Sequence, residues 1–301
     1  GAAWGALLLL KIGFAQSYNV NPIFSINAHG HAMIFGWVGL MVMGFAYQAF
    51  PRFKHTELHR PGLAIASFWL MSTGLIVRVI AEPFHDRGEI FFYAGLASCA
   101  LELAAILIFM GLMLKTFAKS GKRYEFYDWY ILASMGFFLA QGLWDAALLW
   151  LTTTAPNQQV LLARVAAYQA PLRDLQIHGF ATLMILGVSQ RYLPAMYGFK
   201  APSARLSKAL FAQLVLAILG EVVFFVLMRR TEQHMLYGKL FYASMLVFGG
   251  IVAAFAYDWR IFKRCGDPDR STKFLQTAYG WLLVSVLMMA ALPFYMRWYA
   301  Q

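Results

Sequence analysis

Long runs of hydrophobic residues alternate with short polar segments along the whole chain. A run of about twenty apolar residues is long enough to cross a bilayer as a helix. The segments between the runs contain Asn-Pro, Arg-Pro, Ala-Pro and Gly-Asp-Pro, which favour helix ends and turns. The pattern therefore predicts an all-α fold, a polytopic transmembrane helical bundle of about eight to nine spans that forms a single domain over residues 1–301. The expected helices cover residues 2–17, 27–50, 62–81, 89–115, 127–152, 172–193, 207–228, 237–257 and 275–298.

The composition supports a membrane protein. Hydrophobic residues make up 60% of the 301 residues and charged residues only 13%, which excludes an ordinary soluble domain. The net charge of +11 comes from Lys and Arg between the spans, so it indicates topology and a lipid bilayer as partner, with no nucleic acid. Cys99 within a span and Cys265 between spans indicate neither a disulfide framework nor covalent haem attachment. Because no initiating Met is present, we expect that residue 1 is not the start of the gene product.

Lys and Arg are concentrated in every second segment between the spans. The segments between these, at 82–88 and 153–171, hold fewer basic residues and are expected on the outer face, whereas Arg229 and Arg230 depart from the rule. Because positively charged segments are retained in the cytoplasm, we predict that the basic segments face it. They cover residues 51–61, 115–126, 191–208 and 258–274.

Histidines gather at one level of the predicted topology. Two spans that run from outside to inside begin alike, with HGHAMIFGW from His29 and HGFATLMIL from His178. Each then ends in a basic, proline-containing sequence, FPRF or QRYLP, which indicates a weak internal repeat. Five of the seven histidines fall at or near the outer face: His29, His31, His85, His178 and His234.

The repeated histidines suggest a haem site. A neutral imidazole is a common ligand of iron and copper. Two axial histidines must come from two facing helices at matching depth, a condition that His29 and His178 meet in this topology. The glycines on the two helices leave room for a macrocycle, or they serve tight helix packing. They are Gly30, Gly36, Gly39, Gly44, Gly179 and Gly187.

Charged residues inside the spans are the next candidates, because a charge in the bilayer usually faces the bundle interior. Arg78 and Arg173 are candidate partners for haem propionates, or ordinary interfacial arginines. Asp174 precedes His178 by one helical turn, so it either orients that imidazole or favours the helix N-terminus. Glu102 and Asp145 also lie within apolar spans.

His31 points about 200° away from His29 on a regular helix, so the two are not expected to share an iron. Glu221 and His234 are predicted at the same depth as His31. Together the three would form a mixed nitrogen and oxygen site suited to copper or non-haem iron. The alternative is that each is a separate hydrogen-bonded polar residue at the membrane interface.

The span HGHAMIFGWVGLMVMGFAYQAFPRF resembles the histidine-rich helix of the NnrS family. The match rests on a His-x-His pair, a Phe-Gly and Gly-Phe pattern and a closing Pro-Arg. The second copy resembles a later histidine-bearing helix of that family. The matching residues are His29, His31, Phe35, Gly36, Gly44, Phe45, Pro51 and Arg52 in the first helix, and His178, Gly179, Gly187 and Pro194 in the second.

The resemblance implies a protein of the bacterial inner membrane that carries haem b, with copper or non-haem iron, and is related to haem-copper oxidases and nitric oxide reductases. A full three-histidine metal centre is not found in this sequence. The implied function is therefore electron transfer or nitric oxide-related chemistry, as an oxidoreductase component or a subunit of a larger respiratory complex. Two alternatives stay open: a transporter or channel with a polar outer site, and a structural subunit without a cofactor.

Overall fold

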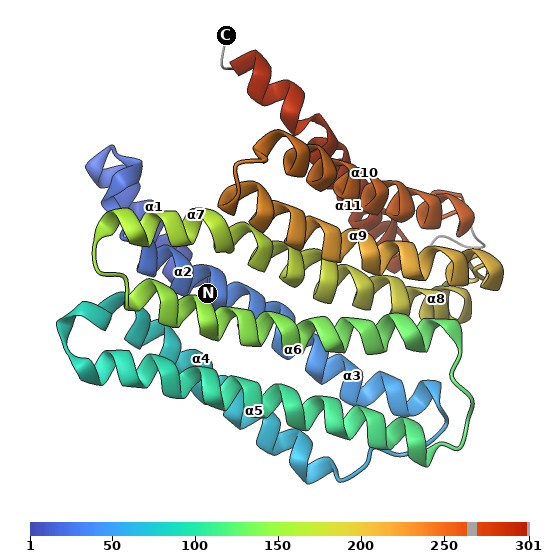
Figure 1. Cartoon of the computed structure of the whole chain (residues 1–301). Coiled ribbons are helices and arrows are strands. Elements are labelled where there is room, and N and C mark those ends of the chain that lie inside the picture. Colours follow the sequence, from blue (N-terminus) through green and yellow to red (C-terminus); the bar gives the residue numbers. More distant parts are fainter. Residues whose placement is uncertain (264–269, 300–301) are drawn as a thin grey trace. The chain divides into compact units, whose positions relative to one another are not determined.

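The computed structural model describes residues 1–263 and 270–299, and each regular element in those ranges is helical (Figure 1). The predicted all-α fold is confirmed, and seven helices in the described part are long and apolar enough to cross a membrane. Within the predicted segment 258–274, residues 264–269, with Cys265 and the Gly-Asp-Pro sequence, lie outside the described residues.

The helices follow the predicted order. The first two histidines lie on one continuous helix, Ile23–Phe53, and His178 lies on another that runs from α7 through α8. Each of these two helices contains a π-helical segment, η2 or η4, and short 3-10 turns form η1 and η3. In chain order the elements are α1 Ala2–Ala15, η1 Tyr18–Val20, α2 Ile23–His31, η2 Ala32–Gly39, α3 Leu40–Phe53, α4 Pro61–Ala81, η3 Glu82–Arg87, α5 Glu89–Lys119, α6 Phe126–Thr153, α7 Gln158–Asp174, η4 Leu175–Thr182, α8 Leu183–Tyr197, α9 Ala204–Arg230, α10 His234–Asp258 and α11 Arg270–Tyr299.

One predicted loop is wrong. Residues 153–171 were expected to be an outer loop, but α7 begins at Gln158 and continues past the Ala-Pro sequence, with Pro171 buried inside the helix. The Asn157 side chain accepts a hydrogen bond of 2.9 Å from the Val160 amide and so caps the first turn. The Gln, Leu, Ala and Arg residues that follow are strong helix formers, although they are too polar to resemble a membrane span.

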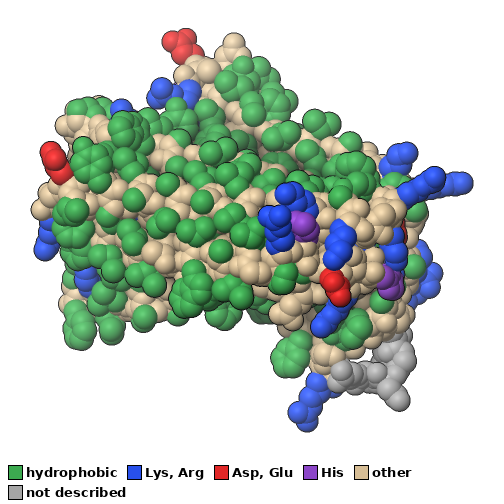
Figure 2. Space-filling view, turned by 90° about the horizontal axis from the view of Figure 1, so that it is seen from below, with side chains coloured by type: hydrophobic (Ala, Val, Ile, Leu, Met, Phe, Trp, Pro, Cys, Tyr) green, Lys and Arg blue, Asp and Glu red, His purple; other side chains and the backbone are tan. Residues whose placement is uncertain are grey.

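The exposed surface is that of a multi-pass membrane protein. Large apolar side chains such as Trp37, Trp69 and Leu216 are 69%, 63% and 66% exposed. Figure 2 shows hydrophobic side chains spread over the visible face, with Lys and Arg gathered mainly toward its edges. A bilayer covers such apolar surface, which would be costly in water.

The chain divides into two compact units. Unit 1 comprises residues 1–123 and 138–165, and unit 2 comprises residues 124–137 and 166–301. Each unit contains one of the two similar histidine-bearing helices.

In unit 1 the closest helix pair is α4 and α5. Gly74 of α4 faces Glu102 of α5, and a Cβ atom at Gly74 would lie only 2.7 Å from Glu102 Cγ and 3.1 Å from the Ser98 carbonyl oxygen. The missing side chain therefore lets the two helices approach. In unit 2, α9 and α10 have the most extensive contact. Gly187 of α8 has a similar role to Gly74, because the Ile131 side chain of α6 packs directly against it.

Candidate functional site

Unit 1 buries His31 between two carboxylates. His31 Nε2 lies 3.0 Å from Glu102 Oε1, and Nδ1 lies 3.3 Å from Asp145 Oδ2. The contacts come from α5 and α6, while the Phe35 ring stacks on the imidazole at 4.4 Å between ring centroids. An imidazole with a proton on each nitrogen satisfies both carboxylates. His31 Nε2 is hydrogen-bonded to Glu102, whereas Nδ1 faces Asp145 at ion-pair distance without a hydrogen bond.

Arg78 of α4 completes the cluster in unit 1. Its Nη2 lies 3.1 Å from Asp145 Oδ2, and its Nε donates to Glu82 Oε2 at 2.8 Å. Its Nη1 also lies 2.9 Å from the sulfur of Cys99. Arg78 and Glu82 are each only 2% exposed, so the guanidinium is an integral part of a buried ion network. We call His31, Arg78, Glu82, Glu102 and Asp145 the unit 1 cluster.

Unit 2 buries a second histidine with a different set of neighbours. One ligand atom each of Asp174, His178 and Glu221 lie within 4.8 Å of one another. His178 Nδ1 and Glu221 Oε2 share a hydrogen bond of 2.6 Å, and the ring of Phe248 stacks on the imidazole at a centroid distance of 4.0 Å. We call Asp174, His178 and Glu221 the unit 2 cluster.

The unit 2 cluster is incomplete in its polar contacts. Glu221 is 1% exposed, yet its Oε1 atom has no hydrogen-bond partner. Neither Asp174 nor Glu221 forms an ion pair with Lys or Arg among the described residues. Buried carboxylates are costly unless they are paired or bind a metal. Apart from His178, no cationic side chain pairs with these carboxylates among the described ion pairs, so a bound cation would find two carboxylates and one imidazole.

The local helix geometry builds the unit 2 cluster. Asp174 ends α7, and His178 follows four residues later within the π-helical segment η4, so the two side chains share one face. The Thr182 hydroxyl donates to the Ile177 carbonyl at 2.8 Å and satisfies an acceptor in this segment. Glu221 is contributed by α9. Single-turn π-helical insertions are frequent at functional sites.

His29 has a different environment from His31. It is half-buried, and its Nδ1 lies 3.0 Å from the Gly1 carbonyl oxygen. Gly5 of α1 covers the ring so closely that a Cβ atom there would lie 2.7 Å from His29 Cε1. His29 belongs to unit 1 and His178 to unit 2, so a common haem site for them stays a prediction.

The proposed partners of His31 have other contacts. Glu221 is bonded to His178, and His234 is exposed with its Nδ1 donating to the Met228 carbonyl. The structure instead pairs His31 with Glu102 and Asp145. Each of these two residues was recognisable in the sequence as a charge within an apolar span, but their partner was not.

The candidate propionate partners are also engaged. Arg78 is held inside the unit 1 cluster, whereas Arg173 is half-buried and its Nη1 donates to Gln176 Oε1 at 2.6 Å. Of these two arginines, Arg78 is buried, and only Arg173 is exposed enough to contact a haem propionate.

Side chains of neighbouring helices pack against several of the glycines on the histidine-bearing helices. A Cβ atom at Gly39 would lie 3.3 Å from Phe138, one at Gly179 2.8 Å from Phe137, and one at Gly187 2.9 Å from Ile131. Gly44, by contrast, faces open space. The packing alternative therefore accounts for these three glycines without a macrocycle.

Comparison with known proteins identifies a family. The family model described as NnrS protein matches residues 1–301, which is the whole chain. No curated protein and no solved structure gives a significant match.

Proposed function

The chain belongs to the NnrS family, a nitric oxide-related family of membrane proteins, and from this premise we propose that it is a metal-binding redox protein of the bacterial inner membrane. In this proposal the unit 2 cluster holds one non-haem iron or copper ion. The protein acts in electron transfer or nitric oxide-related chemistry, as an oxidoreductase component or as a subunit of a larger respiratory complex.

The observation that carries the proposal is the buried Glu221 oxygen without a partner, beside two other metal-binding side chains within 4.8 Å. Two carboxylates and a neutral imidazole match the charge of a divalent ion. Metal binding displaces protons from its ligands, so an ion would replace the proton now shared by His178 and Glu221. One nitrogen with carboxylate oxygens suits iron, and copper also binds such donors tightly.

A haem b between His29 and His178 is the second candidate. It is favoured by the hydrogen bonds at the Nδ1 atoms of both histidines, which direct the Nε2 atoms to the ligand role. A bound haem would supply reversible one-electron chemistry. However, Phe248 stacks on His178, and Phe137 packs against Gly179. This packing and the orphaned carboxylate fit a single ion better than a macrocycle.

Metal analysis and absorption spectroscopy on the same purified sample separate the two candidates. We expect about one iron or copper per chain, no haem bands in the reduced-minus-oxidised spectrum, and loss of the metal in His178→Ala and Glu221→Gln. His234→Ala is the matched control, because His234 is an exposed histidine of the same unit. Haem bands that disappear in His178→Ala would establish the second candidate. A protein without metal or haem would overturn both.

The proposal also includes an orientation, with the basic segments in the cytoplasm. The segment between α5 and α6 contains Lys122 and Arg123, both exposed, so trypsin can test its location. We expect cleavage there in inside-out vesicles and protection in right-side-out vesicles. The opposite result would invert the orientation.

A further inference from the structure

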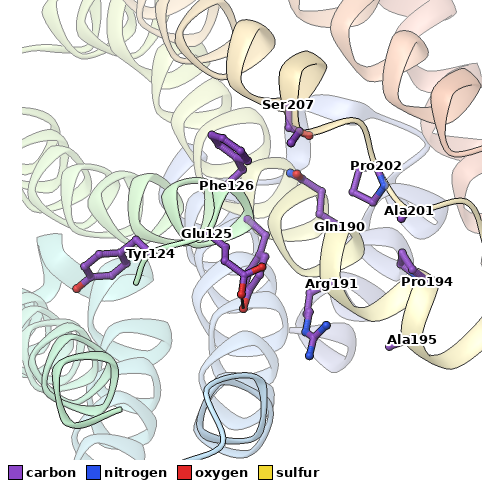
Figure 3. Close-up of a pocket in the computed structure, with 12 residues that line it drawn as sticks. Tyr124, Glu125, Phe126, Gln190, Arg191, Pro194, Ala195, Ala201, Pro202 and Ser207 are labelled. Atoms are coloured by element: carbon purple, nitrogen blue, oxygen red, sulfur yellow. Dashed lines mark hydrogen bonds between the residues drawn. The ribbon is translucent and has the colours of Figure 1, made fainter. Parts of the chain in front are cut away.

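Unit 2 contains a cavity of about 630 Å³ that is separate from the metal cluster. It lies among the start of α6, the end of α8 and the first turns of α9 (Figure 3). Its volume is within the range of about 300–1,000 Å³ typical of small-molecule sites and exceeds what one inorganic ion requires. Phe126, Pro194 and Pro202 supply apolar walls.

The walls of the cavity are fixed by specific contacts. Gly198 ends α8 with a φ of 65°, a conformation that favours glycine. Asp258 then holds the following segment, because it accepts from Lys200 Nζ at 2.6 Å and from the Ser203 amide at 3.2 Å. Tyr130 donates to the Ser207 carbonyl at 2.7 Å and so ties α6 to α9. The cavity is therefore built by the fold and is not a gap beside a loose loop.

Two buried hydrogen-bond donors at the cavity have no partner among the described residues, and an arginine lies beside them. Gln190 is 6% exposed and its Nε2 is unpaired, and Ser207 is 1% exposed with an unpaired Oγ. Arg191 is half-buried, and none of the described ion pairs or hydrogen bonds engages its guanidinium. Figure 3 shows the end of Gln190 beside Ser207, with Arg191 on the adjoining part of α8. Buried donors without partners are rare in folded proteins.

The charges around the cavity define the ligand. The first turn of α9 adds the partial positive charge of a helix N-terminus, and together with Arg191, Gln190 and Ser207 it favours an anion with several acceptor oxygens. Glu125 lines the same cavity and forms no ion pair with Arg191. A carboxylate beside an anion site disfavours a ligand that is only negative and favours one that also carries a cation.

We propose that this cavity binds a phosphate ester adjacent to an ammonium group, as in the headgroup of a phosphatidylethanolamine lipid. The phosphate contacts Arg191, Gln190 and Ser207, the ammonium contacts Glu125, and the apolar walls contact the glycerol and upper acyl carbons. The same chemistry occurs in free phosphoethanolamine, which lacks the acyl chains. The site is independent of the metal cluster, because the two share no residue.

Binding of defined ligands to the delipidated, purified full-length protein in detergent tests this proposal. The probes are short-chain phosphatidylethanolamine, short-chain phosphatidylglycerol, phosphoethanolamine and inorganic phosphate. We expect phosphatidylethanolamine to bind most tightly, at least about 10-fold more tightly than phosphatidylglycerol, since a charged hydrogen-bonded pair discriminates by roughly that factor. Phosphoethanolamine binding as tightly as the lipid would assign the site to a free metabolite. Binding of inorganic phosphate alone, or no binding, would overturn the proposal.

Variants of the lining residues sharpen the test. Arg191→Gln should weaken phosphatidylethanolamine binding about 10-fold or more, and Arg191→Lys should restore part of it. Glu125→Gln should reverse the preference toward phosphatidylglycerol. Lys208→Gln is the matched control, because Lys208 is an exposed cation of α9 outside the cavity. An equal loss in Lys208→Gln and Arg191→Gln would show general surface attraction and refute the site. Unchanged thermal unfolding and metal content verify that the variants are folded.

Discussion

Two buried histidines, one in each unit, both lie beside two carboxylates, but only the first cluster contains an arginine. In unit 1, Arg78 and His31 face the carboxylates of Glu82, Glu102 and Asp145. In unit 2, His178 faces Asp174 and Glu221 without Arg or Lys among their described ion pairs. The first arrangement places an arginine beside its carboxylates, whereas in the second an unpaired carboxylate oxygen has no Lys or Arg among the described ion pairs, although each cluster has one buried polar atom without a hydrogen bond. A histidine in an apolar helix is therefore a better candidate for a metal ligand when Lys and Arg do not compensate the neighbouring carboxylates.

The two histidine-bearing helices also share a structural feature. Each contains a π-helical segment at its histidine, η2 directly after His31 and η4 around His178. The two segments are not in the same register, because η2 begins after His31 whereas His178 is the fourth residue of η4, so they do not show which of His29 and His31 corresponds to His178.

The largest expected effect is the removal of the arginine from the unit 1 cluster. Arg78→Leu leaves Glu82 buried without its cation and leaves Asp145 with His31 alone, which should destabilise the protein by about 3–5 kcal/mol. Thermal unfolding of the purified protein in detergent measures the loss. Arg87→Leu, at an exposed arginine that follows the same helix, should change stability by no more than about 0.5 kcal/mol. Equal effects of the two substitutions would contradict a structural role for the unit 1 cluster.

Metal removal should affect only the unit 2 cluster. A ligand present at about 100 times its dissociation constant stabilises the folded state by about 2.7 kcal/mol. A strong chelator should therefore lower the unfolding temperature of the native protein, but not that of Glu221→Gln, which already lacks the ion. Glu102→Gln retains the unit 2 cluster and should respond to the chelator like the native protein. A response lost in Glu102→Gln and kept in Glu221→Gln would place the metal in unit 1.

Close packing at Gly74 positions Glu102 next to His31. A methyl group at this position would lie 2.7 Å from Glu102 Cγ and 3.1 Å from a backbone carbonyl oxygen, so Gly74→Ala should destabilise by about 1–3 kcal/mol. Gly111→Ala is the control on α5, because nothing lies within 4 Å of a Cβ there. It should be neutral or slightly stabilising in the same unfolding measurement. A neutral Gly74→Ala would show that α4 and α5 can separate without cost.

Hydropathy predicts the helices because a bilayer requires long apolar segments whatever their packing. It fails at α7, whose polar residues form a helix through capping at Asn157 and high helix propensity. Depth alone also fails to pair side chains: Glu221 was assigned to His31 but bonds to His178. Which side chains contact each other depends on the rotation of each helix about its own axis. A π-helical segment changes that rotation by a fraction of a turn for the residues that follow. Asp174 and His178 were easier to relate because they are one turn apart in sequence.

The smallest expected effect distinguishes the two cofactor candidates. His29 is half-buried, and its described hydrogen bond is to the Gly1 carbonyl, so His29→Ala should change stability by no more than about 0.5 kcal/mol. If the unit 2 cluster binds a single ion, the variant keeps its full metal content, because Asp174, His178 and Glu221 are untouched. If a haem is bound by both histidines, the same variant loses an axial ligand, and its haem absorption shifts or disappears.

His85→Ala controls for the loss of an imidazole, because His85 is another half-buried histidine of unit 1 whose ring is hydrogen-bonded to a backbone carbonyl. Metal loss in His29→Ala but not in His85→Ala, without any haem bands, would contradict a metal site made of the unit 2 cluster alone.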